Sequence, residues 1–322
     1  MTHDEMTPPP RSGRDSVLMP VTAVEFISPS GVCRAWHGAA DTDVLAGPQG
    51  RPIVVMAHGV GGTVDSGLLP FAKPLCAIGC DVLAFDYYGF GASAGVGGQS
   101  VSMRRQVEDY HAAVDTARSL PTADPDRVVL WGASLAGGHV VVVAAQRSDV
   151  AAVIAVTPLV DGWAAAILAL RHRRPGSLAR CTLAGIRSRI RTARGGRPIT
   201  IPLVGLPGED AALNLDGYHD RYTALAGPTW VNQIDAAVGF ELLRYRPTRV
   251  AAKVRCPILV QIGDADRSAP PAAQAAMAAK AGASVQHYPC DHFDVWPHGP
   301  AFDAVIAHQR EFLYTLFRDS PR

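Results

Sequence analysis

Residues 128–138 read VVLWGASLAGG, and this stretch decides the fold class of the chain. The apolar run Val128–Trp131 predicts a buried strand, and the small and apolar residues Leu135–Gln146 predict a helix. Ser134 stands at the junction of the two elements. A strand that runs directly into a helix is the repeating unit of parallel α/β sheets, so we searched the rest of the chain for further units.

Ser134 has a small residue two positions away on each side, Gly132 and Ala136. A nucleophilic serine on a sharp strand-to-helix turn needs such neighbours, because the turn is strained and the hydroxyl has to be exposed. Ala136 stands where the usual G-x-S-x-G motif has its second glycine, so the match is incomplete. A serine that merely caps a helix would fit this stretch equally well, and other parts of the chain have to decide between the two interpretations.

Short apolar strands alternate with helical patterns on both sides of this stretch. A β-hairpin is expected at Val21–Ile27 and Val32–Trp36, further strands at Ile53–Met56, Val82–Phe85, Val153–Val156, Pro257–Ile262 and Ser284–Tyr288, and helices at Leu68–Ile78, Ser102–Ser119, Ala272–Ala281 and Phe302–Phe317. Strands that are apolar on both faces are typical of a parallel sheet covered by helices. The chain therefore predicts an α/β fold with a doubly wound, mostly parallel sheet.

The alternation stops at Pro158 and resumes at Pro257. Residues 159–250 contain Gly- and Pro-rich turns and an arginine-rich run from Arg171 to Arg197. We expect them to form a partly helical cap, inserted into a core domain of residues 16–158 and 251–322. Residues 1–15 are expected to be a disordered tail.

The composition restricts the possible partners and locations. The chain has 322 residues and a formal net charge of +1, so no global field attracts it to nucleic acid or to a membrane. The N-terminus has no apolar signal-peptide core, and no stretch has the length and apolarity of a membrane span. The six cysteines are scattered and do not suggest a disulfide framework. We therefore expect a cytoplasmic protein without nucleic-acid or membrane partners.

Residues suited to acyl transfer follow several of the expected strands. This chemistry needs a nucleophile, a base and donors for the oxyanion. The loop HGVGG at residues 58–62 follows one strand, GDADRSAP at residues 263–270 follows another, and CDHFD at residues 290–294 follows a third. Serine, aspartate and histidine therefore occur in this order, each after its own strand, with Ser134 first.

With these motifs, the chain resembles the α/β-hydrolase superfamily from about Val21 onward, and most of all its esterase-like and peptidase-like members with a cap. The resemblance implies a catalytic triad of Ser134, Asp266 and His292. The family places its acid in a G-x-x-D turn, which selects Asp266 over Asp264. The segment CDHFD is similar to the G-H-F-D segment that carries the family's histidine.

The resemblance also implies the oxyanion site and the reaction. The backbone N–H groups of Leu135 and Val60 are the expected donors, and His58 is expected to brace the loop before Val60. The implied function is hydrolysis of a small-molecule ester, thioester, lactone or amide through an acyl-enzyme on Ser134. No cofactor and no metal ion are expected for this reaction.

Two other sites were weighed and rejected. GFGASA at residues 89–94 matches a G-x-G-x-x-A dinucleotide fingerprint, but the acidic residues Glu108 and Asp109 lie inside an expected helix instead of at the end of a strand. We interpret it as a structural turn. The His, Cys and Asp residues in 287–294 lack the paired spacing of zinc ligands.

Other functions remain open. A lyase, cyclase or acyltransferase could use the same triad, and a ligand-binding homologue could lack catalysis. The arginine-rich run is either a solvated helical face or a source of cations for a carboxylate, phosphate or coenzyme A portion of the substrate. The absence of interleaved aromatic residues argues against nucleic-acid binding. The oligomeric state is not determined, with a homodimer as one option.

Overall fold

A mostly parallel sheet forms the centre of the molecule. The computed structural model describes residues 21–93, 95 and 98–318, so the expected tail at 1–15 lies outside the described residues. Within them, eight strands form one sheet in the order β1-β2-β4-β3-β5-β6-β9-β10. The β1–β2 and β2–β4 pairs are antiparallel, and the other neighbouring pairs are parallel. The predicted α/β fold with a mostly parallel sheet is confirmed.

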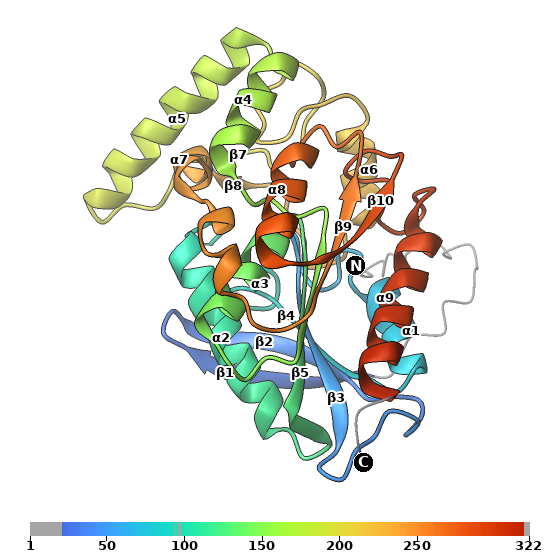
Figure 1. The fold of residues 1–322 in the computed structure, drawn as a ribbon. Helices are drawn as coiled ribbons and strands as arrows, with labels where there is room; N and C mark the ends of the chain where they lie inside the picture. The colour runs from blue at the N-terminus through green and yellow to red at the C-terminus, as the bar shows by residue number, and fades with distance from the viewer. Residues whose placement is uncertain (1–20, 94, 96–97, 319–322) are drawn as a thin grey trace, which may run out of the picture.

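The strands of this sheet are β1 (Val21–Ser28), β2 (Gly31–Gly38), β3 (Arg51–Ala57), β4 (Asp81–Phe85), β5 (Ala123–Ala133), β6 (Ala152–Val156), β9 (Ile258–Gly263) and β10 (Ser284–Tyr288). Helices α1 (Leu69–Ala77) and α9 (Phe302–Arg318) cover one face, and α2 (Met103–Ser119), α3 (Leu135–Gln146) and α8 (Pro271–Ala281) cover the other (Figure 1). Several strands extend beyond their predicted ends, and β5 does so most. β5 begins at Ala123, because this residue pairs with Arg51 of β3 beyond an irregularity in the ladder.

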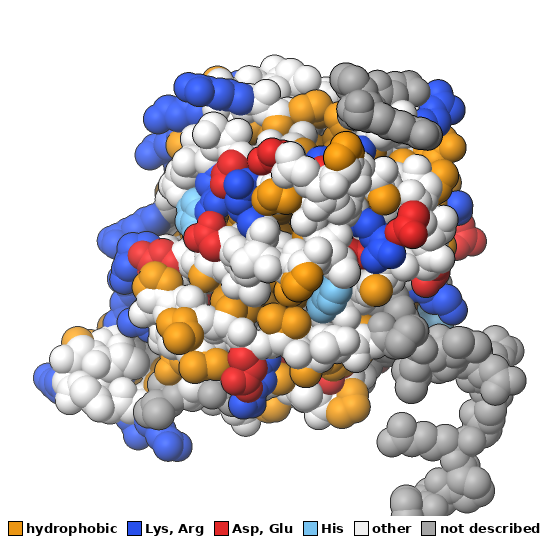
Figure 2. All heavy atoms as spheres, turned by 90° about the horizontal axis from the view of Figure 1, so that it is seen from below, with side chains coloured by type: hydrophobic (Ala, Val, Ile, Leu, Met, Phe, Trp, Pro, Cys, Tyr) orange, Lys and Arg blue, Asp and Glu red, His pale blue; other side chains and the backbone are white. Residues whose placement is uncertain are grey.

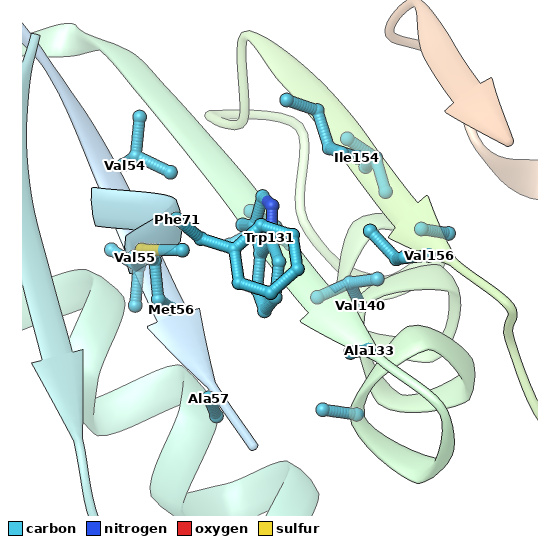
Figure 3. Packing of buried hydrophobic residues seen from close by; sticks show 14 of the residues in the cluster. Val54, Val55, Met56, Ala57, Phe71, Trp131, Ala133, Val140, Ile154 and Val156 are labelled. Atoms are coloured by element: carbon cyan, nitrogen blue, oxygen red, sulfur yellow. The ribbon is translucent and has the colours of Figure 1, made fainter. Parts of the chain in front are cut away.

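Helices pack against both faces of the sheet at β5. Figure 3 shows Phe71 of α1 against Trp131 of β5, and their ring centroids lie 4.9 Å apart. Trp131 is fully buried, and its indole N–H donates to Oε1 of Gln309 in α9 at 3.0 Å. On the other face, Val140 of α3 lies near Val156 of β6 (Figure 3). Close packing on both faces fixes the end of β5, where Ser134 follows.

The chain between β6 and β9 lies above the carboxyl ends of the strands in Figure 1. It forms α4 (Gly162–His172), α5 (Pro175–Ala193), β7 (Thr200–Ile201), α6 (Tyr218–Leu225), β8 (Ile234–Asp235), α7 (Val238–Arg244) and the 3-10 turns η1 (Pro247–Arg249) and η2 (Ala251–Lys253). The segment is partly helical, as expected. Its division from the core at residues 158 and 251 stays a prediction.

The surface facing away from this segment mixes charges of both signs. Figure 2 shows the face that is seen from below in Figure 1, where acidic and basic side chains lie among one another. Among the described residues, no helix is long and apolar enough to cross a membrane.

Candidate active site

Ser134 occupies a strained turn between β5 and α3. Its backbone has φ 55° and ψ −116°, a region that residues with a side chain rarely adopt. Two backbone hydrogen bonds hold this conformation: the N–H of Ser134 donates to the carbonyl of Val156 at 2.9 Å, and its carbonyl accepts from the N–H of Leu159 at 2.8 Å. Strain of this kind persists only where surrounding contacts enforce it, and it is concentrated at functional sites.

The residues around the turn explain the incomplete motif. A Cβ at Gly132 would lie 2.3 Å from the carbonyl oxygen of Ala136, so only glycine fits there. A Cβ at Gly137 would lie 2.7 Å from Cβ of Pro158. The side chain of Ala136 itself is fully buried without such a conflict. The steric requirement for glycine therefore falls on positions 132 and 137, and alanine is accommodated at 136.

The structure brings Ser134, His292 and Asp266 together. Nε2 of His292 lies 3.0 Å from Oγ of Ser134, and Nδ1 lies 2.7 Å from Oδ2 of Asp266. The other carboxylate oxygen of Asp266 accepts from the N–H groups of Ser268 and Ala269, both at 2.7 Å. Because the carboxylate can only accept from Nδ1–H, Nε2 carries the lone pair, which faces the serine hydroxyl.

The surroundings of His292 make it a stronger base than an ordinary histidine. Burial by itself lowers the pKa of the imidazole, because it penalises the charged form. The negative charge of Asp266, its hydrogen bond to the ring, and the charge of Asp291 outweigh this effect and raise the pKa of His292 above its usual value. A carboxylate on each side of the residue therefore favours the imidazolium that proton abstraction would produce.

Asp291 is a functional candidate that the sequence analysis missed. Its Oδ1 accepts from the backbone N–H groups of His292 at 2.8 Å and Arg267 at 2.9 Å, and from the hydroxyl of Tyr218 at 3.0 Å. Burial raises its pKa, but the hydrogen bonds from Arg267 outweigh burial and hold the pKa below its usual value. Its position directly before His292 was the available signal.

Asp264, the rejected alternative to Asp266, lies elsewhere. Its Oδ1 contacts Nδ1 of His287 at 2.7 Å, and both side chains are about half exposed. Neither residue contacts Ser134 or His292. Among the described residues, His292 and not His298 forms the hydrogen bonds to Ser134 and Asp266.

The loop with Val60 approaches the serine closely. A Cβ at Gly59 would lie 3.0 Å from Cβ of Ser134. Among the described residues, neither the N–H of Val60 nor that of Leu135 donates to a protein acceptor. The carbonyl of Val60 accepts a hydrogen bond from the hydroxyl of Tyr222 in α6 at 2.9 Å. This contact holds the backbone of the loop at Val60. Two unpaired donors near the serine are what an oxyanion would need.

His58 lies beneath this loop and is almost fully buried. Its Nδ1–H donates to the carbonyl of Gly59 at 2.9 Å, and its ring packs edge-on against Tyr87. Burial lowers the pKa of His58 to about 4, so the ring is neutral at physiological pH. This arrangement fits the expected bracing role.

A cavity of about 30 Å³ adjoins Ser134. Core residues, among them Trp296, form one side, and Leu213, Tyr222 and Leu225 from the chain between β6 and β9 form the other. The volume corresponds to roughly one water molecule. None of the arginines from Arg171 to Arg197 is among the described residues that line it. The hypothesis that they contact the substrate has no support from this geometry.

The turn that matches the dinucleotide fingerprint contains structural contacts of Asp86. The carboxylate of Asp86 accepts from the N–H groups of Val64 at 2.7 Å and Ala92 at 2.9 Å, and fills the turn at residues 89–93. A Cβ at Gly91 would lie 2.3 Å from Asp86, whereas residue 94 lies outside the described chain. Asp109 accepts from Ser28 Oγ at 2.6 Å. In residues 21–93, 95 and 98–318, no group of His, Cys, Asp and Glu side chains is arranged to hold a metal ion.

Comparison with known proteins gave matches over most of the chain. The model of a family described as serine aminopeptidase, S33 matches residues 48–292. The quorum-quenching protein AidA of Acinetobacter baumannii is 33% identical over 293 residues, which cover 90% of this chain and 93% of that protein. Polyketide transferase af380 of Aspergillus fumigatus is 25% identical, with 79% of this chain and 83% of that protein covered.

A solved structure gave a similar result for the fold. The α/β hydrolase GrgF from Penicillium sp. sh18 superimposes with a TM-score of 0.75, covering 92% of this chain and 99% of that one. The two sequences are 23% identical, so this likeness concerns the fold alone.

Proposed function

Since this chain belongs to the serine aminopeptidase S33 family of α/β-hydrolases, we propose that it is a serine hydrolase. It cleaves a small-molecule carboxylic ester, or a related thioester, lactone or amide, through an acyl-enzyme on Ser134. The proposal rests above all on the two hydrogen bonds that join Asp266 to His292 and His292 to Ser134. No cofactor takes part in the proposed reaction.

In the first half of the reaction, Oγ of Ser134 attacks the carbonyl carbon of the substrate while Nε2 of His292 takes the hydroxyl proton. The C–O bond to Ser134 forms as the carbonyl π electrons move onto oxygen. Asp266 keeps the imidazole in the required tautomer and stabilises the imidazolium. The imidazolium then protonates the leaving group as the bond to it breaks.

The N–H groups of Val60 and Leu135 are the proposed donors to the oxyanion. Such donors lower the barrier because they are already in position when the oxyanion forms, so the site does not have to reorganise during the reaction. Losing one such donor typically raises the barrier by about 3 kcal/mol. The hydrogen bond from Tyr222 to the carbonyl of Val60 supports this role, since it holds the backbone of the residue whose N–H is the proposed donor.

In the second half, Nε2 of His292 removes a proton from water as the water oxygen attacks the acyl carbon. The bond from that carbon to Oγ of Ser134 then breaks, and the imidazolium returns the proton to Oγ as the free acid leaves. A cavity of about 30 Å³ is too small for a substrate together with this water. Substrate entry therefore requires movement of a lining side chain such as Leu225 of α6, while the hydrogen bond of Tyr222 to Val60 stays in place. The cytoplasmic location expected from the sequence stays a prediction.

A second candidate is acyl transfer to an acceptor other than water. The relative named a polyketide transferase favours it, as does a site that holds little water. Product analysis distinguishes the two candidates: hydrolysis releases the free acid, and transfer gives a new ester or amide when an alcohol or amine is supplied.

The test is the change Ser134→Ala, with the exposed helical Ser119→Ala as the control. We expect hydrolysis of p-nitrophenyl acetate to fall by at least about 10³-fold in Ser134→Ala and to be unchanged in the control. A fluorophosphonate should label the wild-type protein and the control but not Ser134→Ala. Wild-type rates in Ser134→Ala would show that another group performs the chemistry, and an unlabelled wild-type protein would favour a non-catalytic role.

A further inference from the structure

The helices α4 and α5 expose an unusual number of large apolar side chains. Six of the thirteen large hydrophobic side chains that are exposed in the described residues belong to them: Trp163, Ile167, Leu170, Leu183, Ile186 and Ile190. We call these six residues the outer apolar face. Their spacing places the first three on one stripe of α4 and the last three on one stripe of α5.

The residues that α5 buries fix which of its faces points to solvent. Its buried residues are small: Ser177, Cys181, Gly185 and Ser188. Ser177 Oγ donates to the carbonyl of Glu209 at 2.7 Å, and Ser188 Oγ donates to Oδ1 of Asp235 at 2.6 Å. A helix in a globular protein normally buries its large apolar side chains. Here the buried hydrogen bonds hold small residues inward, so the large ones face outward.

A groove connects the two helices. It has a volume of about 480 Å³ and is lined by Leu170 of α4 together with Leu178, Leu183 and Ile186 of α5. Only Arg173 and Arg174 separate the two helices in the chain, and α4 and α5 lie in the upper part of the molecule in Figure 1. Three residues of the outer apolar face, Leu170, Leu183 and Ile186, therefore share one groove across the two helices and are not scattered singly over the surface.

The same segment carries a strong positive charge. Residues 162–197 contain nine arginines and no aspartate or glutamate, whereas the formal charge of the whole chain is +1. Arg180 pairs with Asp210 and Arg189 with Glu241. Arg187, Arg191 and Arg194 are exposed, have no ion pair with a described carboxylate, and line a second groove beside Ile190.

The charge decides which partner fits. A second copy of the chain would bring the same arginines face to face, and like charges that meet at an interface repel and oppose association. An anionic lipid surface instead attracts arginines and accepts apolar side chains between its headgroups. The long arginine side chains can reach the headgroups while Ile186 and Ile190 enter the acyl boundary. We propose that α4 and α5 dock the protein on an anionic phospholipid membrane through the outer apolar face.

The test is co-sedimentation of the full chain with phosphatidylcholine vesicles, with and without phosphatidylglycerol. We expect binding only with phosphatidylglycerol, and weaker binding as the salt concentration rises. Ile186→Glu should weaken it by roughly tenfold or more, and the triple change Arg187→Glu, Arg191→Glu and Arg194→Glu by on the order of 100-fold or more.

Two matched variants control for added negative charge. Ile27→Glu changes an isoleucine that is 83% exposed on β1. The triple change Arg105→Glu, Lys253→Glu and Arg255→Glu reverses three exposed charges outside α4 and α5. We expect both controls to bind like the wild-type protein, and all variants to keep its circular dichroism spectrum and its esterase rate on a water-soluble substrate.

Three results would overturn the proposal. The first is no binding of the wild-type protein to phosphatidylglycerol vesicles, which would favour an acidic protein as the partner. The second is equal weakening by the control variants. The third is a dimer in vesicle-free solution that Ile186→Glu dissociates, because the outer apolar face would then belong to a second copy.

Discussion

His292 lies between two carboxylates with different contacts. Asp266 accepts from Nδ1 of the ring, whereas Asp291 accepts from the backbone N–H of His292 and is held by Arg267. Asp266 can therefore orient the ring, and Asp291 acts on it mainly through its charge. Both charges favour the protonated ring, so the pKa of His292 is raised. Arg267 limits the effect of Asp291 because it neutralises part of that charge.

The pH dependence of the reaction should report this arrangement. His292 has to be neutral to accept the proton of Ser134, so activity should fall as the pH is lowered through its pKa, which lies above the usual 6.5. Asp291→Asn removes a charge that raises this pKa, and we expect the acid limb of kcat/KM to move to lower pH. The measurement is the pH profile of p-nitrophenyl acetate hydrolysis.

Asp264→Asn is the matched control, because Asp264 pairs with the exposed His287 and does not contact His292. We expect its acid limb to coincide with that of the wild-type protein. An unchanged limb in Asp291→Asn would contradict the electrostatic role, and equal shifts in both variants would indicate a general effect of charge.

The junction of β5 and α3 depends on a close approach of backbone to backbone. β5 delivers Ser134 at the carboxyl edge of the sheet, and α3 begins at the next residue. The helix can begin there because the Cα of Gly132 lies against the carbonyl of Ala136 in its first turn. Any side chain at position 132 would separate the strand from the helix and move the serine hydroxyl away from His292.

Gly132→Ala should therefore impair both folding and catalysis. We expect a loss of about 1–3 kcal/mol in the free energy of unfolding, as for other overpacked sites, and a large fall in kcat. Chemical denaturation and ester hydrolysis measure the two effects. Gly239→Ala in α7 is the control, since no atom lies within 4 Å of its added Cβ. Gly239→Ala, in the first turn of α7, should change the free energy of unfolding by less than about 1 kcal/mol. Similar losses in both variants would contradict the steric argument.

In the complete molecule, the segment between β6 and β9 lies over the carboxyl edge of the sheet (Figure 1). The sheet supplies Ser134, Asp266 and His292 from the ends of β5, β9 and β10, and α6 covers them with Tyr222 and Leu225. Tyr222 also stacks with Trp230 and contacts Phe293, which follows His292. In the proposed reaction, we therefore expect the side chains of α6 to limit both the size of the acyl group and the access of water.

Leu225→Ala should enlarge the cavity and change the preferred acyl chain length. We expect the ratio of kcat/KM for p-nitrophenyl octanoate to that for the acetate to rise by roughly tenfold, since a few methylenes in an apolar pocket have effects of this size. Leu206→Ala, at a leucine that is 53% exposed, is the control and should leave the ratio unchanged. An unchanged ratio in Leu225→Ala would mean that another segment limits the acyl group.

Much of the fold could be predicted from local patterns. Buried strands such as Val153–Val156 are continuous apolar runs, and the loops after them carry the residues of the site. The start of β5 was predicted too late because Asp124–Arg127 is polar, and its pairing depends on Arg51 in another strand. The net charge of +1 gave no indication of the arginine-rich surface of α5, because a sum over the chain hides where charges lie.

The amino-acid sequence alone determines the apolar runs, the turn residues at Ser134 and the order of serine, aspartate and histidine along the chain. Other features required the packed molecule. These are the role of Asp291 beside His292, the separation of Asp264 from the site, the closure by Leu225 and the outward rotation of α5. Each depends on contacts between segments far apart in the chain, whose relative placement is decided only when all elements pack against one another.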